Sequence, residues 1–211
     1  MSDAGLLEEF LAGAYVDDAV FALRPDYRAL LVAVDGIVPG PSDQGSDALL
    51  QAAEAAAREA LGDGTADQLP HVAAWREAYR AFGAKPKRTR NSLEALLRRA
   101  ASGLPRVNRL TDLYNAVSVL HQIPVGGEDL TRYTGAPRLI RAAGDEPFDT
   151  TADGVAVIEH PDPGEVVWCD DAGVTCRRWN WRQCARTRIT ATTTTAARPM
   201  AAPTINPRQR F

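Results

Sequence analysis

Two polar side chains followed by a glycine pair make up the first candidate binding site in the sequence. Asp112 and Asn115 are three residues apart in a segment whose leucines and valines recur at helical spacing, so both should lie on one face of a helix. Gly126 and Gly127 follow in the segment 124–129 and would let a ligand approach backbone N–H groups. These residues could bind a polar ligand, although a helix cap and a turn would explain each of them equally well.

The second candidate site is the segment 177–182, which combines arginines with two tryptophans and an asparagine. In a strand, successive side chains would alternate between two faces. The two sets are Arg177, Trp179 and Trp181, and Arg178, Asn180 and Arg182. Aromatic rings stack on nucleobases and guanidinium groups contact phosphates, so this composition is typical of nucleic-acid binding. The alternative is a two-sided strand with its tryptophans in the core and its arginines paired with acidic side chains.

The small net charge of −3 conceals an uneven distribution of charge along the chain. Residues 1–82 carry 5 basic and 14 acidic side chains, whereas residues 83–211 carry 19 basic and 13 acidic ones. Within residues 85–109 there are 8 basic side chains and one acidic side chain, Glu94. This stretch includes a basic loop with Lys85, Lys87, Arg88 and Arg90. A basic surface of this kind favours an anionic partner.

Other sequence features narrow the possible functions. Phosphate-binding Gly-rich loops, dinucleotide-binding fingerprints and nucleophile elbows are absent from the sequence. The three histidines are isolated, and the three cysteines lack paired Cys-x-x-Cys spacing, so we expect neither a metal site nor a cofactor. No apolar run is long enough for a membrane span, and no signal peptide is visible, so we expect a cytoplasmic protein with free thiols and no membrane partner.

The elements that must position these residues are predicted from apolar periodicity and turn signals. Helices are predicted over residues 48–61, 71–82, 92–101 and 108–121. Strands are predicted over residues 19–23 and 28–34, on either side of a Pro-Asp turn, and over 155–158, 166–169 and 174–176. Strands, then helices, then strands indicate a single α+β domain with a mixed or antiparallel sheet flanked by helices. The Ala- and Pro-rich end, 196–211, is predicted to lack regular structure, which places the domain at 1–195.

Several short stretches occur together in the order found in one protein family. The chain resembles the B3/B4 domain, the tRNA-binding and editing module of the phenylalanyl-tRNA synthetase beta subunit, in its free-standing form. The resemblance covers residues 75–190, and its specificity lies in the order and spacing of its motifs. These motifs are Trp75 to Arg80, Ser92 to Leu96, Leu104 to Asn108, Asp112 to Asn115, Pro124 to Asp129, Gly164 to Val167, Asp170, and the segment 177–182.

The resemblance implies a cleft that receives the aminoacylated 3′ end of a tRNA. The synthetase module hydrolyses the ester of a wrongly attached amino acid, and free-standing relatives are thought to do so in trans. Asp112 and Asn115 match the synthetase motif Asp-x-Thr-Asn, and Pro124 and Asp129 match the ends of Pro-x-His-Ala-Phe-Asp. Gly126 stands where the synthetase has His, which argues against a His general base and against the synthetase's own amino-acid specificity.

The resemblance also implies roles for the candidate residues. The amides of Gly126 and Gly127 would polarise the ester carbonyl, while Asp112, Asn115 or Glu165 would bind the ammonium group or orient a water molecule. The substrate-binding set consists of Asp129, Arg177, Arg178, Trp179, Asn180, Trp181 and Arg182 near the tRNA end, with Lys85, Lys87, Arg88 and Arg90 on the acceptor stem.

Two alternatives to this enzyme remain. The chain could be a tRNA- or RNA-binding module without catalysis, or an inactive, truncated relative. The unpatterned tail motivates the second alternative, because an altered C-terminal end would leave one edge of the domain uncovered. A DNA partner is not expected, and the oligomeric state stays open.

Overall fold

The computed structural model describes residues 3–203, which form six α-helices, two short 3₁₀ turns and ten strands. The helices are α1 (Asp3–Ala12), α2 (Asp18–Leu23), α3 (Gln44–Leu61), α4 (Pro70–Ala81), α5 (Ser92–Arg99) and α6 (Arg109–His121). The 3₁₀ turns are Ala66–Gln68 and Leu130–Arg132. The strands are β1 (Tyr15–Val16), β2 (Tyr27–Val34), β3 (Glu128–Asp129), β4 (Arg138–Arg141), β5 (Phe148–Ala152), β6 (Val155–Glu159), β7 (Val166–Asp170), β8 (Gly173–Arg177), β9 (Arg182–Gln183) and β10 (Ala196–Pro203).

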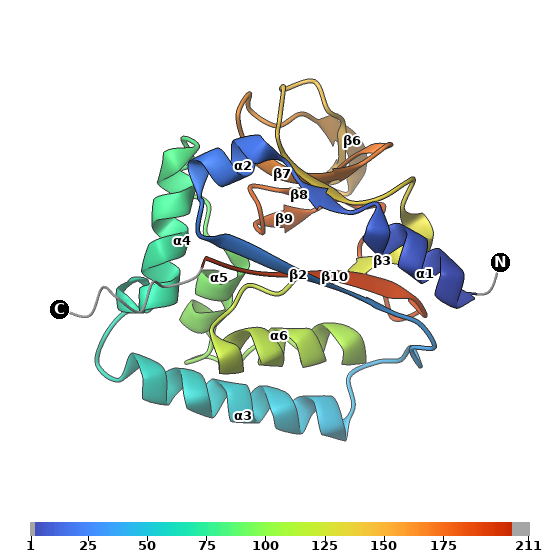
Figure 1. Cartoon of the computed structure of the whole chain (residues 1–211). Helices are drawn as coiled ribbons and strands as arrows, with labels where there is room; N and C mark the ends of the chain where they lie inside the picture. The colour runs from blue at the N-terminus through green and yellow to red at the C-terminus, as the bar shows by residue number, and fades with distance from the viewer. Residues whose placement is uncertain (1–2, 204–211) are drawn as a thin grey trace.

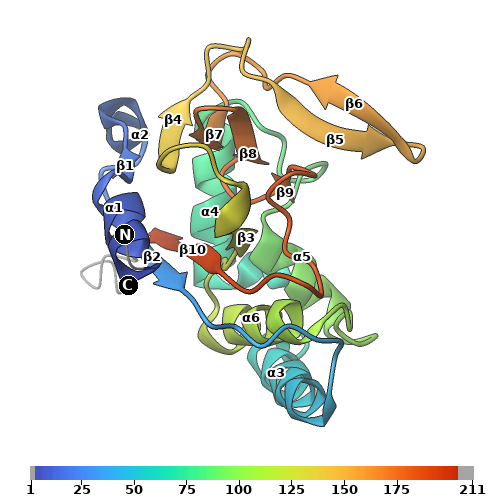
Figure 2. The same cartoon turned by 90° about the vertical axis from the view of Figure 1, so that its right-hand side faces the viewer.

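The strands form three sheets. The largest has the order β1-β4-β7-β8-β9, with β1 parallel to β4 and the other neighbours antiparallel. The second has the antiparallel order β2-β10-β3, and the third is the hairpin β5-β6, which extends away from the body of the molecule (Figure 2). The expected α+β class with a mixed sheet flanked by helices is confirmed.

The predicted helices form where the sequence places polar caps. Asp43 begins α3 with a reciprocal capping box to Ser46, Asn91 accepts from the Glu94 amide at the start of α5, and Asn108 accepts from the Thr111 amide at the start of α6. Each cap satisfies a backbone donor that a helix start leaves unpaired. α3 begins at Gln44, one turn before the predicted start at residue 48, because Asp43 caps it.

Residues 19–23, predicted as a strand, form part of helix α2. The Asp17 side chain caps this helix by accepting from the Ala19 amide, and Val20 of the helix is fully buried. The local preference for β structure is weak in a segment of five residues, and the cap together with burial of one face outweighs it. The strand predicted over 28–34 is confirmed as β2.

The C-terminal segment differs from the prediction of an end without regular structure. Ala196–Pro203 forms β10, which pairs with the whole of β2, from Ala196 opposite Val34 to Pro203 opposite Tyr27, and also with β3. The expected uncovered edge is therefore occupied by this strand itself, because an eight-residue partner supplies the backbone groups that β2 needs. Residues 204–211 of the predicted tail lie outside the described residues.

The two largest of four hydrophobic clusters hold the layers together. In Figure 1, α3 and α6 lie on one side of the β2-β10 pair, and the five-stranded sheet lies on the other. An aliphatic core joins α3, α5 and α6, while an aromatic core centres on Tyr27, Trp75 and Trp179, each at most 1% exposed. The Trp75 and Trp179 rings meet edge to face with centroids 5.3 Å apart. None of the helices in the described region has both the length and the apolar character needed to cross a bilayer.

Candidate functional site

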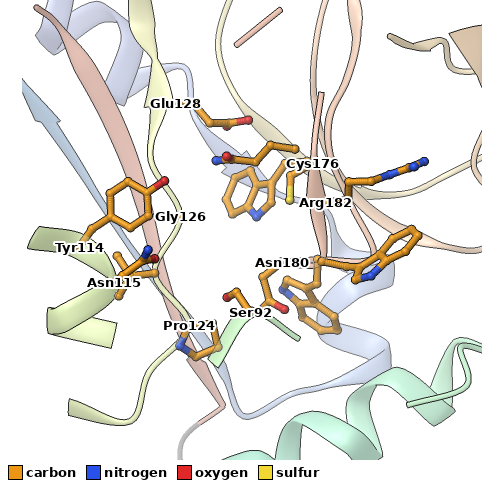
Figure 3. Close-up of a pocket in the computed structure, with 14 residues that line it drawn as sticks. Ser92, Tyr114, Asn115, Pro124, Gly126, Glu128, Cys176, Asn180 and Arg182 are labelled. Carbon is orange, nitrogen blue, oxygen red and sulfur yellow. The ribbon is translucent and has the colours of Figure 1, made fainter. Parts of the chain in front are cut away.

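One cavity lies where the α5 start, α6, the 124–126 loop, β3 and the β7-β8-β9 region meet (Figure 3). Its volume is ≈ 190 Å³. Six of the residues predicted from the sequence line it, namely Asn115, Gly126, Trp179, Asn180, Trp181 and Arg182. They come from three distant parts of the chain, so the tertiary structure brings the two candidate sites of the sequence together in one cavity.

The segment 177–182 reaches this cavity because it is not a straight strand. β8 ends at Arg177, and Arg178 and Trp179 have left-handed backbone angles, φ 47° and 66°. Such angles are uncommon for residues other than glycine and reverse the chain before β9 begins. The predicted alternation of side chains is therefore wrong: Trp179 enters the aromatic core at 1% exposure, while Trp181 is half-buried.

Arg177 and Glu165 form a buried ion pair away from the cavity. Arg177 Nε and NH2 donate to Glu165 Oε1 and Oε2 at 2.9 and 2.8 Å, and the Arg178 amide donates to Glu165 Oε1 at 3.1 Å. Arg177 also donates to Glu159. These bonds occupy the acceptors of Glu165 and most of the Arg177 donors, so both residues have structural partners and neither lines the cavity.

Asp112 and Asp129 are likewise engaged in local structure. Asp112 is fully buried, where Oδ1 accepts from the Val107 amide at 2.8 Å and Oδ2 accepts from Ser46 Oγ at 3.3 Å. Asp129 accepts from the Thr131 amide and hydroxyl and, at 2.9 Å, from Thr193 Oγ1. The expectation that Asp112 and Asn115 serve one site is not met, since Asp112 lies outside the cavity lining and Asn115 within it.

The two glycines of the 124–129 segment have different surroundings. A Cβ built on Gly126 would have Gln183 Nε2 as its nearest neighbour, at 3.7 Å, and Gly126 borders the cavity. A Cβ built on Gly127 would lie 2.6 Å from Ile189 Cδ1 and 3.1 Å from the Tyr114 ring. Close packing therefore explains Gly127, whereas a Cβ on Gly126 would make only an ordinary contact, so packing does not require a glycine there.

Two buried donors on residues that line the cavity lack partners among the described residues. Tyr79 Oη donates to Asn180 Oδ1 at 2.8 Å, which leaves Asn180 Nδ2 buried without an acceptor among the described residues. Ser92 Oγ is also buried without a partner in this part of the chain, and its amide donates to the Asn180 carbonyl at 3.1 Å. Buried polar groups are normally hydrogen-bonded, so this pair of donors is suited to an acceptor on a ligand. Sequence reasoning missed Ser92 in this role because the sequence marked it only as the first residue of the motif Ser92 to Leu96.

Glu128 is the second residue that sequence reasoning missed. It is 2% exposed and accepts from three hydroxyls: Tyr133 Oη, Thr187 Oγ1 at 3.0 Å and Thr175 Oγ1 at 3.3 Å. Burial raises the pKa of its carboxyl above the ordinary value, and the hydroxyl bonds oppose that shift. Its position in the Gly-Gly-Glu-Asp loop carries no signal for burial, because the three hydroxyls come from segments that are distant in the chain.

Two guanidinium groups lie close to the Trp181 ring at the cavity. Arg178 Cζ and Arg182 Cζ lie 4.5 and 4.9 Å from the centre of its ring. Arg182 also lies against the Phe148 ring and is paired with Glu159. Arg178 borders a second hollow of ≈ 500 Å³, so Trp181 and Arg178 connect the cavity with that hollow.

The predicted basic loop lines this second hollow and a third one of ≈ 410 Å³. Lys85, Lys87 and Arg88 are exposed, and within residues 3–203 none of them has an ion-pair partner. Arg80 of α4 adds a further exposed cation to the third hollow. Arg90 differs, since it lies 3.7 Å from the buried Glu94. The loop therefore presents free positive charge that suits phosphate groups.

The described residues contain no cluster of His, Cys, Asp and Glu side chains that could hold a metal ion. The three cysteines are free, and burial raises the pKa of each thiol.

Comparison with known protein families gives one finding. Residues 74–207 match the model of the B3/4 domain. The match begins one residue before the expected region and continues through β10, beyond the expected domain end at 195. No curated protein matches the sequence.

Proposed function

The chain belongs to the B3/4 domain family, and on this basis we propose that it binds tRNA and hydrolyses the ester of a mischarged aminoacyl-tRNA in trans. The B3/4 domain is found in proteins of the phenylalanyl-tRNA synthetase beta type, which bind tRNA. The observation that carries the finer proposal is the cavity in which Asn115, Gly126 and Asn180 converge. It offers polar groups for an ester and apolar walls for a side chain.

The proposed site for the ester carbonyl is the donor pair at the α5 start. Asn180 Nδ2 and Ser92 Oγ are both buried and without partners among the described residues, so a bound carbonyl oxygen would satisfy them. Donors already oriented toward the developing negative charge stabilise the transition state of ester hydrolysis. This assignment replaces the expectation that the Gly127 amide serves the carbonyl, because Gly127 does not line the cavity.

The proposed reaction needs water and no covalent intermediate on the protein. The water oxygen attacks the acyl carbon, the bond from that carbon to the ribose oxygen breaks, and a proton is transferred to the departing oxygen. The products are the free amino acid and the uncharged tRNA. Asn115, which lines the cavity opposite Asn180 in Figure 3, would orient the water, while the absent Cβ of Gly126 leaves room for it. Positioning alone can supply much of the acceleration for an activated ester.

The proposed path of the RNA runs from the cavity over Trp181 and Arg178 to the basic loop. Trp181 offers a face for a terminal base, although two guanidinium groups already stack on it, so the base would contact its free edge or displace one of them. Lys85, Lys87 and Arg88 would bind phosphates of the acceptor stem. Arg177 has no part in this path because Glu165 and Glu159 neutralise it.

A panel of mischarged tRNAs tests the catalytic proposal. The purified chain should hydrolyse at least one charged tRNA well above its spontaneous rate, and Asn180→Ala should lower kcat for it by roughly a hundredfold to a thousandfold, as the loss of a transition-state donor does. Glu77→Gln on the exposed face of α4 serves as the control and should keep full activity. If every charged tRNA decays at its spontaneous rate, the enzyme proposal is lost.

The second candidate function is tRNA binding without catalysis. It is favoured by one observation: Gly126 stands where the synthetase motif has His, and the cavity lining in the described region contains no histidine. In that case uncharged tRNA would bind in a salt-dependent manner and no charged tRNA would turn over.

A further inference from the structure

Glu128 contributes the carboxyl group of the cavity, and none of the other described lining residues is acidic. The carboxyls that the sequence indicated as partners for an ammonium group lie elsewhere, with Asp112 in a loop cap and Glu165 on Arg177. A ligand that carries a positive charge into this cavity would therefore meet Glu128.

No cation is paired with Glu128 among the described residues, and Arg182, which also lines the cavity, is paired with Glu159. The oxygens of Glu128 accept from the hydroxyls of Tyr133, Thr175 and Thr187, and no Arg, Lys or His within residues 3–203 forms an ion pair with it. The nearby charged group that acts on it is Asp170, which is also acidic and is neutralised by Arg186. A buried carboxylate without a cation is costly, so a positively charged ligand would be bound favourably there.

The carboxyl group also retains capacity for one more donor. An ionised carboxylate has about four acceptor positions, and three are filled by hydroxyls. These three neutral donors hold the group in place without cancelling its charge. Burial raises its pKa, and an ammonium group at hydrogen-bond distance would lower the pKa again, so the ligand and the ionised carboxyl stabilise each other.

The two ends of the cavity have complementary chemistry. In Figure 3, Glu128 is at the upper side of the cavity, whereas Ser92 and Asn180 are at the lower side. The Glu128 carboxylate is an acceptor, whereas Ser92 Oγ and Asn180 Nδ2 are donors without partners in the described region. An α-amino ester has a cationic donor and a carbonyl acceptor on adjacent atoms, which matches this arrangement in a small cavity of ≈ 190 Å³.

We propose that Glu128 binds the α-ammonium group of the aminoacyl moiety and thereby selects a free α-amino ester over N-blocked or deaminated acyl groups. This inference rests on the proposed function for the identity of the ligand, but it concerns binding rather than hydrolysis. Glu128 is assigned here as a substrate-binding residue, in place of Asp112 and Glu165.

Binding of two stable adenosine analogues tests the proposal. One carries alanine in amide linkage on its 3′ position, and the other carries propionate in the same linkage and so lacks only the amino group. Quenching of the cavity tryptophans reports the Kd of each. The wild-type chain should bind the alanyl analogue on the order of tenfold to a hundredfold more tightly, which is the usual effect of a hydrogen bond to a charged group.

Glu128→Gln should bind the two analogues equally, and Glu128→Asp, which keeps the charge, should recover part of the preference. Glu77→Gln makes the same chemical change on an exposed helix face and should keep the wild-type ratio. Thermal unfolding of each variant verifies that it is folded. If Glu128→Gln does not fold, the ratio of the two analogue Kd values measured for Glu128→Asp decides the question. A wild-type preference retained in Glu128→Gln, or absent from the wild type, overturns the proposal.

The analogue-binding test of Glu128 and the deacylation test of the proposed function can fail independently of each other. A chain that hydrolyses charged tRNA but binds both analogues equally keeps the enzymatic function and loses the role of Glu128. A chain that hydrolyses none but loses its preference for the alanyl analogue on Glu128→Gln keeps the role of Glu128 and loses the enzymatic function.

Discussion

The hydroxyl of Tyr79 on α4 donates a 2.8 Å hydrogen bond to Oδ1 of Asn180, which lies 101 residues later in the turn between β8 and β9. Burial raises the pKa of Tyr79 well above its ordinary value, so the phenol keeps the proton that it donates. This bond fixes the orientation of the Asn180 amide group. Nδ2 is left as the free donor, and a residue outside the cavity lining thereby orients one inside it.

Tyr79→Phe should therefore affect both stability and substrate use. Removing the hydroxyl leaves Asn180 Oδ1 without its donor, and we expect unfolding to become easier by about 1–2 kcal/mol. The amide would also be free to rotate, which should raise KM for charged tRNA or lower kcat. Urea unfolding and deacylation kinetics measure the two effects. Tyr15→Phe, at a tyrosine that is 51% exposed, is the control, and a variant equal to it in both assays would contradict the prediction.

Breaking the Arg177–Glu165 pair should destabilise the fold strongly. Glu165 is 2% exposed, so Arg177→Met would leave a buried carboxylate without its bidentate partner. We expect a loss of about 3–5 kcal/mol in urea unfolding. Asp171→Asn removes one member of the exposed pair with Arg138 and should cost less than about 1 kcal/mol. Equal losses of unfolding free energy in the two variants would show that the buried pair stabilises the fold no more than the exposed pair does.

The two neighbouring glycines should respond differently to the same substitution. In Gly127→Ala the new methyl group would meet Ile189 and Tyr114 at 2.6 and 3.1 Å, which should cost about 1–3 kcal/mol of stability through overpacking. In Gly126→Ala the nearest atom is 3.7 Å away, so the fold should be retained while the methyl group narrows the cavity and weakens ligand binding. Thermal unfolding and analogue binding, measured on both variants, distinguish the two effects. A destabilised Gly126→Ala together with a stable Gly127→Ala that binds the analogue weakly would contradict the prediction.

Neutralising the basic loop should reduce the salt dependence of tRNA binding. Lys85, Lys87 and Arg88 are exposed and free of ion pairs in the described region, so each can release counterions from a phosphate. For the triple alanine variant we expect weaker binding and a plot of log K against log salt that is less steep by roughly 2–3. Arg58→Ala at the end of α3 is the control. If the triple variant keeps the wild-type slope, the RNA does not bind at this loop.

The raised pKa of Glu128 predicts a pH dependence of stability. The folded state holds this proton at pH values where the unfolded carboxyl, with an ordinary pKa of 4.5, has already lost it. The contribution of Glu128 to the unfolding free energy therefore falls as the pH rises from 4.5 to the folded-state pKa. Glu128→Gln cannot titrate, so its stability should decline less over that window. Urea unfolding at several pH values measures this, and parallel curves for the two proteins would exclude the effect.

Much of the helical part of the fold could be predicted from local signals. The apolar periodicity and turn signals of the sequence predicted α5 and α6 to within two residues, because these signals act within one or two helical turns. The β7-β8 hairpin followed from β-branched residues on either side of a short turn. α2 was missed because six residues carry too little periodicity to outweigh their local preference for β structure.

The candidate site was only partly predictable. Residue types and spacing identified Asn115, Gly126 and the segment 177–182, and the structure brings these together. They could not separate Asn115 from Asp112, or Gly126 from Gly127, since members of each pair differ only in which distant atoms they meet. Burial and partnership depend on contacts between segments far apart in the chain.

The sequence by itself determined the family, the helices and the free charge of the 85–88 loop, because order, periodicity and charge are properties of the linear chain. The tertiary structure alone decided what each polar residue does. The left-handed backbone of Arg178 and Trp179 after β8 places the Trp179 ring in the aromatic core. Arg177 forms a buried ion pair with Glu165 and is therefore not available to a ligand. β3, placed beside β10, left Glu128 at the cavity among three hydroxyls and without a paired cation, and such pairing exists only once the chain has folded.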